Sequence, residues 1–279
     1  IPGQGVLSLG VRENWAIVRI SHNVAANATY YTQGLLVDTG RTLTVAGANP
    51  TITNPSPFAF TAGSGFGIFN NWYTGLNGNM DLNGESQFIQ QDRSILDVTS
   101  GGYLERDQQG TANRFTYNYW SSPVSDINTT ANNQDFTLGD VFLDGTVTTA
   151  PATITWTADE NGAVGPPITL STRWIYKFVN GADEDYDAWQ FVRNTGAISP
   201  GEGYTMKGTS DVAHERDEQN YIFRGKPNNG DISVGPLGDT NLYLVGNPYP
   251  SALDANEFLN DNPNMEGTIY FWEHWGGGT

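Results

Sequence analysis

The chain has 279 residues, no cysteine and a formal net charge of −17. This length suffices for one large or two ordinary domains, and the lack of cysteine excludes disulfides, thiolate metal ligands and thiol nucleophiles. Nucleic acid is not an expected partner, because its binding depends on lysine and arginine, and no apolar run is long enough to span a membrane as a helix.

The first 116 residues are predicted to form a β-solenoid-like repeat domain, that is, a parallel β-helix. The 33 glycines and the low charged fraction of 15% are typical of an all-β chain with many turns. Short runs with aliphatic inner and polar outer positions recur, as stacked solenoid rungs require. They cover residues 15–20, 34–45, 78–82, 86–90, 94–98 and 102–105. A β-sandwich is the alternative for this part.

Trp72 and Tyr73 interrupt this rhythm with two adjacent aromatic rings. They serve either as a cap on the stacked rungs or as an exposed platform. Capping is the more common role, because most tryptophan and tyrosine side chains bury area.

Residues 117–279 are predicted to form an antiparallel β-sandwich of the jelly-roll type with one short helix, truncated at its C-terminal end. The expected strands cover residues 115–120, 142–143, 152–156, 168–179, 188–192, 221–224, 242–245 and 268–272. The helix is expected over 251–259, with Ser251 as its N-cap and Asp254 three residues on. Because the chain begins with neither methionine nor an export signal, we expect a processed or truncated piece of a longer protein.

Five sequence strings in the second part carry a resemblance to a known group of proteins. They are YNYWSSPV (117–124), SPGEGYTMKG (199–208), YIFRGKPNNGDI (221–232), LVGNPYPSALDANEFL (244–259) and IYFWEHW (269–275). Together they resemble a module of large secreted surface proteins of the Bacteroidota, flavobacteria among them. Such proteins are typically exported by the type IX secretion system, and the module often precedes a C-terminal sorting domain. The resemblance implies an extracellular, cell-surface location and offers no catalytic motif to carry over.

A candidate calcium site lies in the acidic stretch that contains Asp183, Asp185 and Asp187. These carboxylates occupy alternate positions, as in the first half of an EF-hand loop. The sixth position is Ala188 instead of glycine and the twelfth is Asn194 instead of glutamate, so the full EF-hand pattern is absent. Calcium is therefore the candidate cofactor if other loops add ligands, and a solvated hairpin tip is the alternative.

Catalysis finds little support, so we expect that the chain is not an enzyme. The three histidines, His22, His214 and His274, are far apart and belong to neither an HExxH motif nor a nucleophile elbow.

Two functions remain, and both are non-catalytic. The first is a structural and adhesive segment, or adhesin, of a large secreted cell-surface protein, with surface glycans or other cell-surface or secretion-system proteins as partners. The alternative is a carbohydrate-binding module of a secreted polysaccharide-degrading enzyme, because exposed aromatic rings can stack on sugars. The candidate platform consists of Trp72, Tyr73, Trp272 and Trp275.

Overall fold

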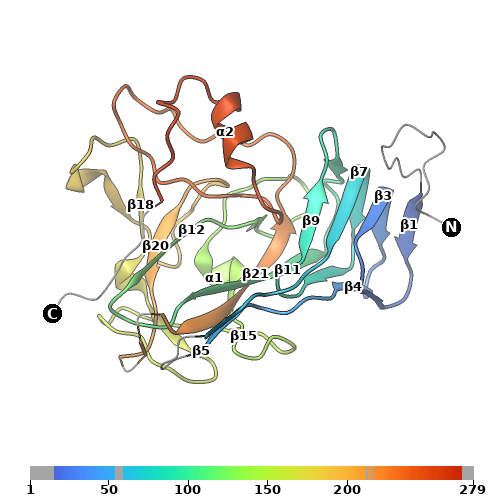
Figure 1. The fold of residues 1–279 in the computed structure, drawn as a ribbon, viewed down its shortest axis with the longest axis horizontal. Helices are drawn as coiled ribbons and strands as arrows, with labels where there is room; N and C mark the ends of the chain where they lie inside the picture. The colour runs from blue at the N-terminus through green and yellow to red at the C-terminus, as the bar shows by residue number, and fades with distance from the viewer. Residues whose placement is uncertain (1–15, 54–58, 212, 215, 272–279) are drawn as a thin grey trace.

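The computed structural model describes residues 16–53, 59–211, 213–214 and 216–271. Within these residues the chain is mostly β, as the sequence predicts, and most strands belong to two large sheets (Figure 1). We call the parallel one sheet A and the mixed one sheet B. No helix in the described ranges is both long and apolar enough to cross a membrane.

Sheet A contains five parallel strands in the described part of the chain. They are β1 (Ile17–Ile20), β3 (Tyr30–Val37), β7 (Gly67–Leu76), β9 (Gln87–Gln90) and β10 (Ile95–Leu96). The strand order is β1–β3–β7–β10, and β9 also pairs with β7. Side chains such as Leu35, Ile68 and Phe88 are buried on the inner face, so alternating burial accounts for these strands.

Sheet B combines four parallel strands with antiparallel ones. The parallel strands are β2 (Val24–Ala26), β4 (Thr42–Val45), β8 (Asn79–Leu82) and β11 (Tyr103–Thr111). The antiparallel strands are β21 (Glu218–Pro227), β14 (Phe142–Asp144), β15 (Ala152–Thr153) and the short β13 (Val124–Ser125). The strand order is β15–β14–β21–β11–β8–β4–β2, with β13 beside β21.

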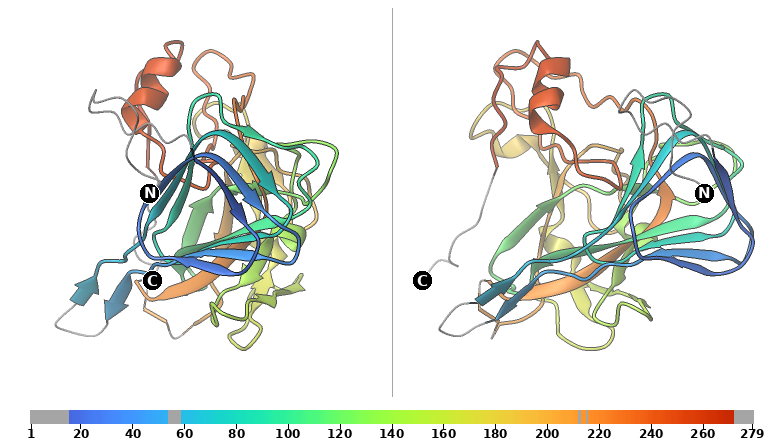
Figure 2. Two further views of the ribbon diagram at one scale, coloured as in Figure 1. Left: turned by 90° about the vertical axis from the view of Figure 1, so that its right-hand side faces the viewer. Right: turned by 45° about the vertical axis from the view of Figure 1, so that its right-hand side comes forward.

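Up to β11 the chain passes repeatedly from sheet A to sheet B. β1 is followed by β2, β3 by β4, β7 by β8, and the pair β9 and β10 by β11. Since all these strands pair in parallel, successive turns of the chain lie one behind another (Figure 2, left). The hairpin of β5 (Thr51–Thr53) and β6 (Ala59–Thr61) is inserted between β4 and β7. Strands form where predicted at 17–20, 79–82, 87–90 and 103–105, whereas the segment 34–45 is split between β3 and β4 by the turn at 38–41, and the segment 94–98 is a strand only at Ile95–Leu96. Trp72 and Tyr73, which were predicted to interrupt the strands, lie within β7, a strand that was not predicted.

Sheet B extends across the predicted domain boundary at residue 116. β11 and β21 pair from Leu104↔Gly225 to Thr111↔Glu218, so the two parts of the chain share one sheet. The boundary itself stays a prediction.

The second part of the chain also forms small two-stranded sheets. Their strands are β12 (Tyr117–Trp120) with β20 (Tyr204–Lys207), β16 (Thr155–Thr157) with β17 (Thr169–Ser171), and β18 (Tyr176–Phe178) with β19 (Trp189–Phe191). The first and last pairs are antiparallel, as predicted. The pair β16–β17 is parallel, contrary to the prediction.

Three predicted strands of this part are wrong, at least over their described residues. The segment 168–179 is interrupted by η1 (Thr172–Trp174), a 3-10 turn that the Ser171 side chain caps. Residues 242–245 make only single bridges, at Leu242 and Val245, because the two bridge partners, Gly181 and Glu202, lie in separate segments and not along one strand. Residues 268–271 form no strand.

The predicted helix is present but begins later than expected. Its residues are α2 (Ala255–Asp261), and the N-cap is Asp254, whose carboxylate accepts hydrogen bonds from the amides of Asn256 and Glu257. Ser251 is therefore not the cap. A second short helix, α1 (Leu138–Val141), was not predicted.

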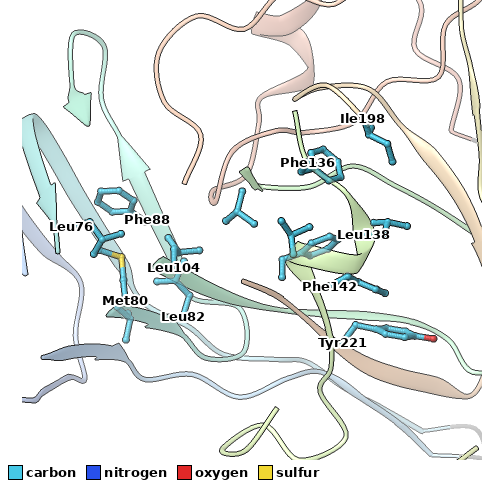
Figure 3. Packing of buried hydrophobic residues seen from close by; sticks show 14 of the residues in the cluster. Leu76, Met80, Leu82, Phe88, Leu104, Phe136, Leu138, Phe142, Ile198 and Tyr221 are labelled. Carbon is cyan, nitrogen blue, oxygen red and sulfur yellow. The ribbon is translucent and has the colours of Figure 1, made fainter. Parts of the chain in front are cut away.

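One connected hydrophobic core extends through both parts of the chain. Figure 3 shows one group of its side chains between sheets A and B, formed by Leu76, Met80, Leu82, Phe88 and Leu104, and another around α1 and β21, formed by Phe136, Leu138, Phe142, Ile198 and Tyr221. In the second group the ring of Tyr221 stacks on Phe142 at a centroid distance of 5.0 Å. Burying each such side chain contributes about 1.5–3 kcal/mol, so this core fixes how the two parts sit together.

Candidate functional site

A β-bulge in β7 presents an aromatic pair on the outer face of sheet A. The register of β3 and β7 passes from Thr32↔Asn70 to Gly34↔Tyr73, so β7 contains one extra residue at this point. Trp72 lies in the bulge and is 48% exposed. The rings of Trp72 and Tyr73 are 5.9 Å apart and tilted by 47°, which makes them neighbours but not coplanar.

Buried polar side chains hold the bulge from the inner face. Asn70 is completely buried, and its side-chain oxygen accepts a hydrogen bond from the Thr32 hydroxyl at 3.1 Å. Its amide nitrogen donates to the Thr74 hydroxyl at 2.6 Å and to the Ser94 hydroxyl at 3.4 Å. Because a buried amide is costly unless its hydrogen bonds are made, this network favours a single backbone conformation beneath the aromatic pair.

Asp97 fixes the ring of Tyr73 from the side. The Tyr73 hydroxyl donates to the Asp97 carboxylate, and this hydrogen bond raises the pKa of Tyr73 and lowers the pKa of Asp97. Asp97 also accepts hydrogen bonds at 2.9 Å from the amide and the hydroxyl of Thr99. The tyrosine is therefore held by a carboxylate that the following turn holds in place.

Apolar side chains surround the pair on the same face. Tyr31 stacks on Phe69 at a centroid distance of 4.5 Å. Ile95 of β10 is exposed and pairs in register with Tyr73. Ile17 is exposed too, on the edge strand β1.

The other members of the predicted platform do not join this pair in the described structure. Trp272 and Trp275 lie outside the described residues. Trp72 is the one strongly exposed tryptophan among those that the structure describes, and Trp120 and Trp156 pack against the core. Of the four residues of the predicted platform, the structure therefore places Trp72 and Tyr73 side by side.

The carboxylates of the predicted calcium site are not brought together. Asp183, Asp185 and Asp187 are exposed in the loop between β18 and β19. Asp185 instead caps η2 (Tyr186–Ala188) by accepting a hydrogen bond from the amide of Asp187 at 3.0 Å. Over the described ranges, no group of three or more histidine, aspartate or glutamate side chains is arranged to hold a metal ion.

A polar hollow beside α1 was not predicted. The loop between β13 and α1 lines an open hollow of about 550 Å³. Its lining side chains are Asp126, Ile127, Asn128, Thr130, Asn133, Gln134 and Asp135. A sequence signal was available, because polar side chains occupy 128–130 in succession and an amide run follows at 132–134.

A buried lysine forms the anchor of this loop. Lys226 of β21 is 1% exposed, and its ammonium donates to the carbonyls of Val98 at 2.7 Å, Asn128 at 3.0 Å and Ala131 at 3.0 Å. Burial lowers the pKa of Lys226, and the nearby Asp97 opposes that effect. Three carbonyls compensate the desolvated ammonium, which ties the loop to β21.

Two further contacts dock the loop against β10 and against the turn after β21. The Asn133 side chain donates to the carbonyl of Asn229 at 2.7 Å and accepts from its amide at 2.9 Å. The Asn132 amide donates to the carbonyl of Leu96 at 2.8 Å. Since Leu96 precedes Asp97, which holds Tyr73, the hollow and the aromatic platform share the residues around β10.

A third group of polar residues lies on sheet B. Asp81 of β8 pairs in register with Glu105 of β11, which in turn forms an ion pair with Arg224 at 2.5 Å. Burial, together with Glu105 and Asp107, raises the pKa of Asp81 to about 6. A single carboxyl with a raised pKa defines no reaction without a cleft or a nucleophile beside it.

One family model matches part of the chain. The family model described as Domain of unknown function (DUF8693) matches residues 162–277. This range includes β17 through α2 and leaves sheet A, the Trp72–Tyr73 platform and the loop of the hollow outside it. No curated protein and no solved structure matches the chain.

Proposed function

We propose that the chain is a non-catalytic structural and adhesive segment of a large secreted cell-surface protein. The observation that supports this most is the repeated passage of the chain between two sheets in parallel register up to β11. We interpret it as a β-solenoid-like stack, in which each turn buries its apolar face against the next. Stacks of this kind extend in one direction, so they suit proteins that hold a binding surface away from the cell.

The rest of the proposal concerns the second part of the chain and its location. We interpret residues 117–279 as a β-sandwich module of the jelly-roll type, joined to the stack through β21. The resemblance to Bacteroidota surface proteins supports an extracellular location and export by the type IX secretion system. Within this proposal the adhesive surface is the outer face of sheet A around Trp72, with glycans or other surface proteins as partners.

Bead adhesion tests this function. Beads coated with the chain should adhere to glycan-coated or cell surfaces, and beads coated with a Trp72→Ala variant should adhere less. Phe191→Ala, an exposed aromatic residue on β19, is the matched control and should leave adhesion unchanged. Equal adhesion by all three proteins would contradict the role assigned to sheet A.

The second candidate is a carbohydrate-binding module of a secreted polysaccharide-degrading enzyme. The exposure of Trp72 beside Tyr73 favours it, because an exposed ring with a hydrogen-bonding neighbour is a suitable surface for a sugar. Because the rings are tilted by 47°, we expect them to contact successive sugar units and not one flat face. A glycan array with calcium and with chelator would detect such binding, and its persistence in Trp72→Ala would exclude this platform as the site.

A further inference from the structure

We propose that Asn161 is a site of spontaneous covalent modification, at which the side-chain amide cyclises onto the backbone and is converted to aspartate or isoaspartate. The reaction needs no partner other than water. It is therefore independent of both functions proposed above and can be tested apart from them.

The reaction takes place between two neighbouring residues of the chain. The backbone nitrogen of the residue after an asparagine loses its proton and attacks the Cγ atom of the asparagine side chain. A bond forms between that nitrogen and Cγ, the bond from Cγ to Nδ2 breaks, and ammonia leaves. Water then opens the resulting succinimide ring at one of its two carbonyls, which gives aspartate or isoaspartate. A following glycine favours the attack, because it has no Cβ atom to restrict the backbone or obstruct the ring.

The chain contains five asparagines that precede a glycine. They are Asn77, Asn83, Asn161, Asn180 and Asn229. Since all five share this glycine, the structure decides which of them reacts. Two features oppose the reaction: a hydrogen bond that retains the proton of the glycine amide, and hydrogen bonds that hold the asparagine side chain in place.

At three of the five positions the glycine amide already donates a hydrogen bond. The Gly78 amide donates to a carbonyl of β3 at 2.9 Å. The Gly84 amide donates to the Asp107 carboxylate at 3.1 Å. The Gly181 amide donates to the carbonyl of Leu242 at 3.2 Å. Because each of these bonds must open before the nitrogen can attack, we expect slow reaction at all three positions.

Asn229 is protected through its side chain instead. Its Oδ1 atom accepts a hydrogen bond from the amide of Leu96 at 3.0 Å. Its Nδ2 atom donates to the side chain of Gln90 and, at 3.1 Å, to the carbonyl of Ser94. The Cγ atom is thus held away from free rotation, and these contacts must break before the ring can form.

Asn161 has neither protection. Its side chain is exposed and forms no hydrogen bond within the described part of the chain. The amide of Gly162 donates to no acceptor among the described residues. Asn77 is exposed as well, but its glycine amide is bonded. The two asparagines therefore form a matched pair that differs in the hydrogen bond of the following amide.

The contacts on both sides of Asn161 determine what the modification would change. The carbonyl of Glu160 accepts a hydrogen bond from the indole of Trp174 at 2.6 Å. Ala163 pairs with Thr169 through two backbone hydrogen bonds of 2.9 Å. Isoaspartate inserts an additional carbon atom into the backbone between these fixed points. We therefore expect the reaction to displace the Glu160 carbonyl and to weaken its bond to the indole.

Incubation of the full chain at mildly alkaline pH, which speeds loss of the amide proton, tests the proposal. Peptide mapping by mass spectrometry measures the conversion of each asparagine, and protein-isoaspartate methyltransferase labels the isoaspartate. The variants are Asn161→Gln and, as the matched control, Asn77→Gln, because a glutamine side chain forms a ring far more slowly. A parallel incubation in urea removes the protection that the fold provides.

In the folded chain we expect Asn161 to react at least about tenfold faster than the other four asparagines, because those need a local opening first. In urea the five rates should converge. Asn161→Gln should remove most of the isoaspartate label from the folded chain, and Asn77→Gln should leave it unchanged. Equal rates at Asn161 and Asn77 in the folded chain would overturn the inference. So would an Asn161 that reacts in urea but stays intact in the folded chain.

Discussion

Replacing Lys226 by methionine tests the anchor of the loop 126–135. Methionine keeps most of the aliphatic stem but removes the ammonium, so the carbonyls of Val98, Asn128 and Ala131 lose their shared donor. An unsatisfied buried polar group costs about 1–3 kcal/mol. Since removal of the ammonium also removes its own desolvation cost, we use the lower value for each carbonyl and expect a loss of about 3 kcal/mol.

Urea unfolding followed by tryptophan fluorescence measures this loss as a lower midpoint with an unchanged slope. Arg19→Met is the control, because Arg19 forms a surface ion pair with Asp38 and is 68% exposed, and such pairs contribute about 0–1 kcal/mol. Amide hydrogen exchange should also become faster in the loop 126–135 of the Lys226 variant. Equal midpoints for the two variants, with no change in exchange, would refute the anchoring role.

Three further changes test other features of the structure. Folding raises the pKa of Asp81 to about 6, so its carboxyl destabilises the fold as pH rises from about 4 to 6. The Asp81→Asn variant should therefore have a free energy of unfolding about 1 kcal/mol higher than the wild type at pH 7, after allowance for solvent screening, and an equal one at pH 4. Urea midpoints at the two pH values measure this difference. Gly102→Ala would place a Cβ atom 1.8 Å from the Gly78 carbonyl oxygen and should lower the melting temperature far more than Gly101→Ala, whose nearest atom is 3.3 Å away. Asp254→Ala removes the cap of α2, at a cost of about 1 kcal/mol, and should speed amide exchange within that helix without a comparable change elsewhere.

Several strands up to β11 could be predicted because their burial pattern is local, whereas β7 was missed because the buried Asn70 and the bulge at Trp72 break the alternation. Leu43 and Val45, or Met80 and Leu82, alternate with polar residues, and this period of two is visible in a single sequence. Stacked parallel rungs were predicted, but the assignment of each strand to sheet A or sheet B is a tertiary property that only the structure gives.

The second part was predicted less well because its pairings connect distant residues. Leu242 looked like the start of a strand, but its partner is Gly181, and the adjacent residues find no continuous ladder. The segment that includes Trp174 looked like one long strand, but Ser171 caps a turn within it. A tertiary contact overrides local strand propensity at Leu242, whereas a local side-chain cap interrupts the strand after Ser171.

The candidate site was predictable only in its residue types. Trp72 and Tyr73 stand out as adjacent aromatic residues, yet the exposure of Trp72 depends on a bulge that is supported by Asn70. The hollow depends on Lys226, which is far in sequence from the carbonyls it holds. No single-sequence pattern reveals a contact of that kind.

The pairing of β11 with β21 has a consequence for synthesis of the protein. β11 ends at Thr111, and the partner that covers its free edge begins at Glu218, about a hundred residues later in the chain. At translation rates of roughly 5–20 residues per second, a ribosome needs about 5–20 seconds to make that interval. During this time the nascent chain exposes the backbone groups of β11, which are a template for pairing with another chain. A holding chaperone at that stage of translation, or slow folding after release, would protect this strand until β21 arrives.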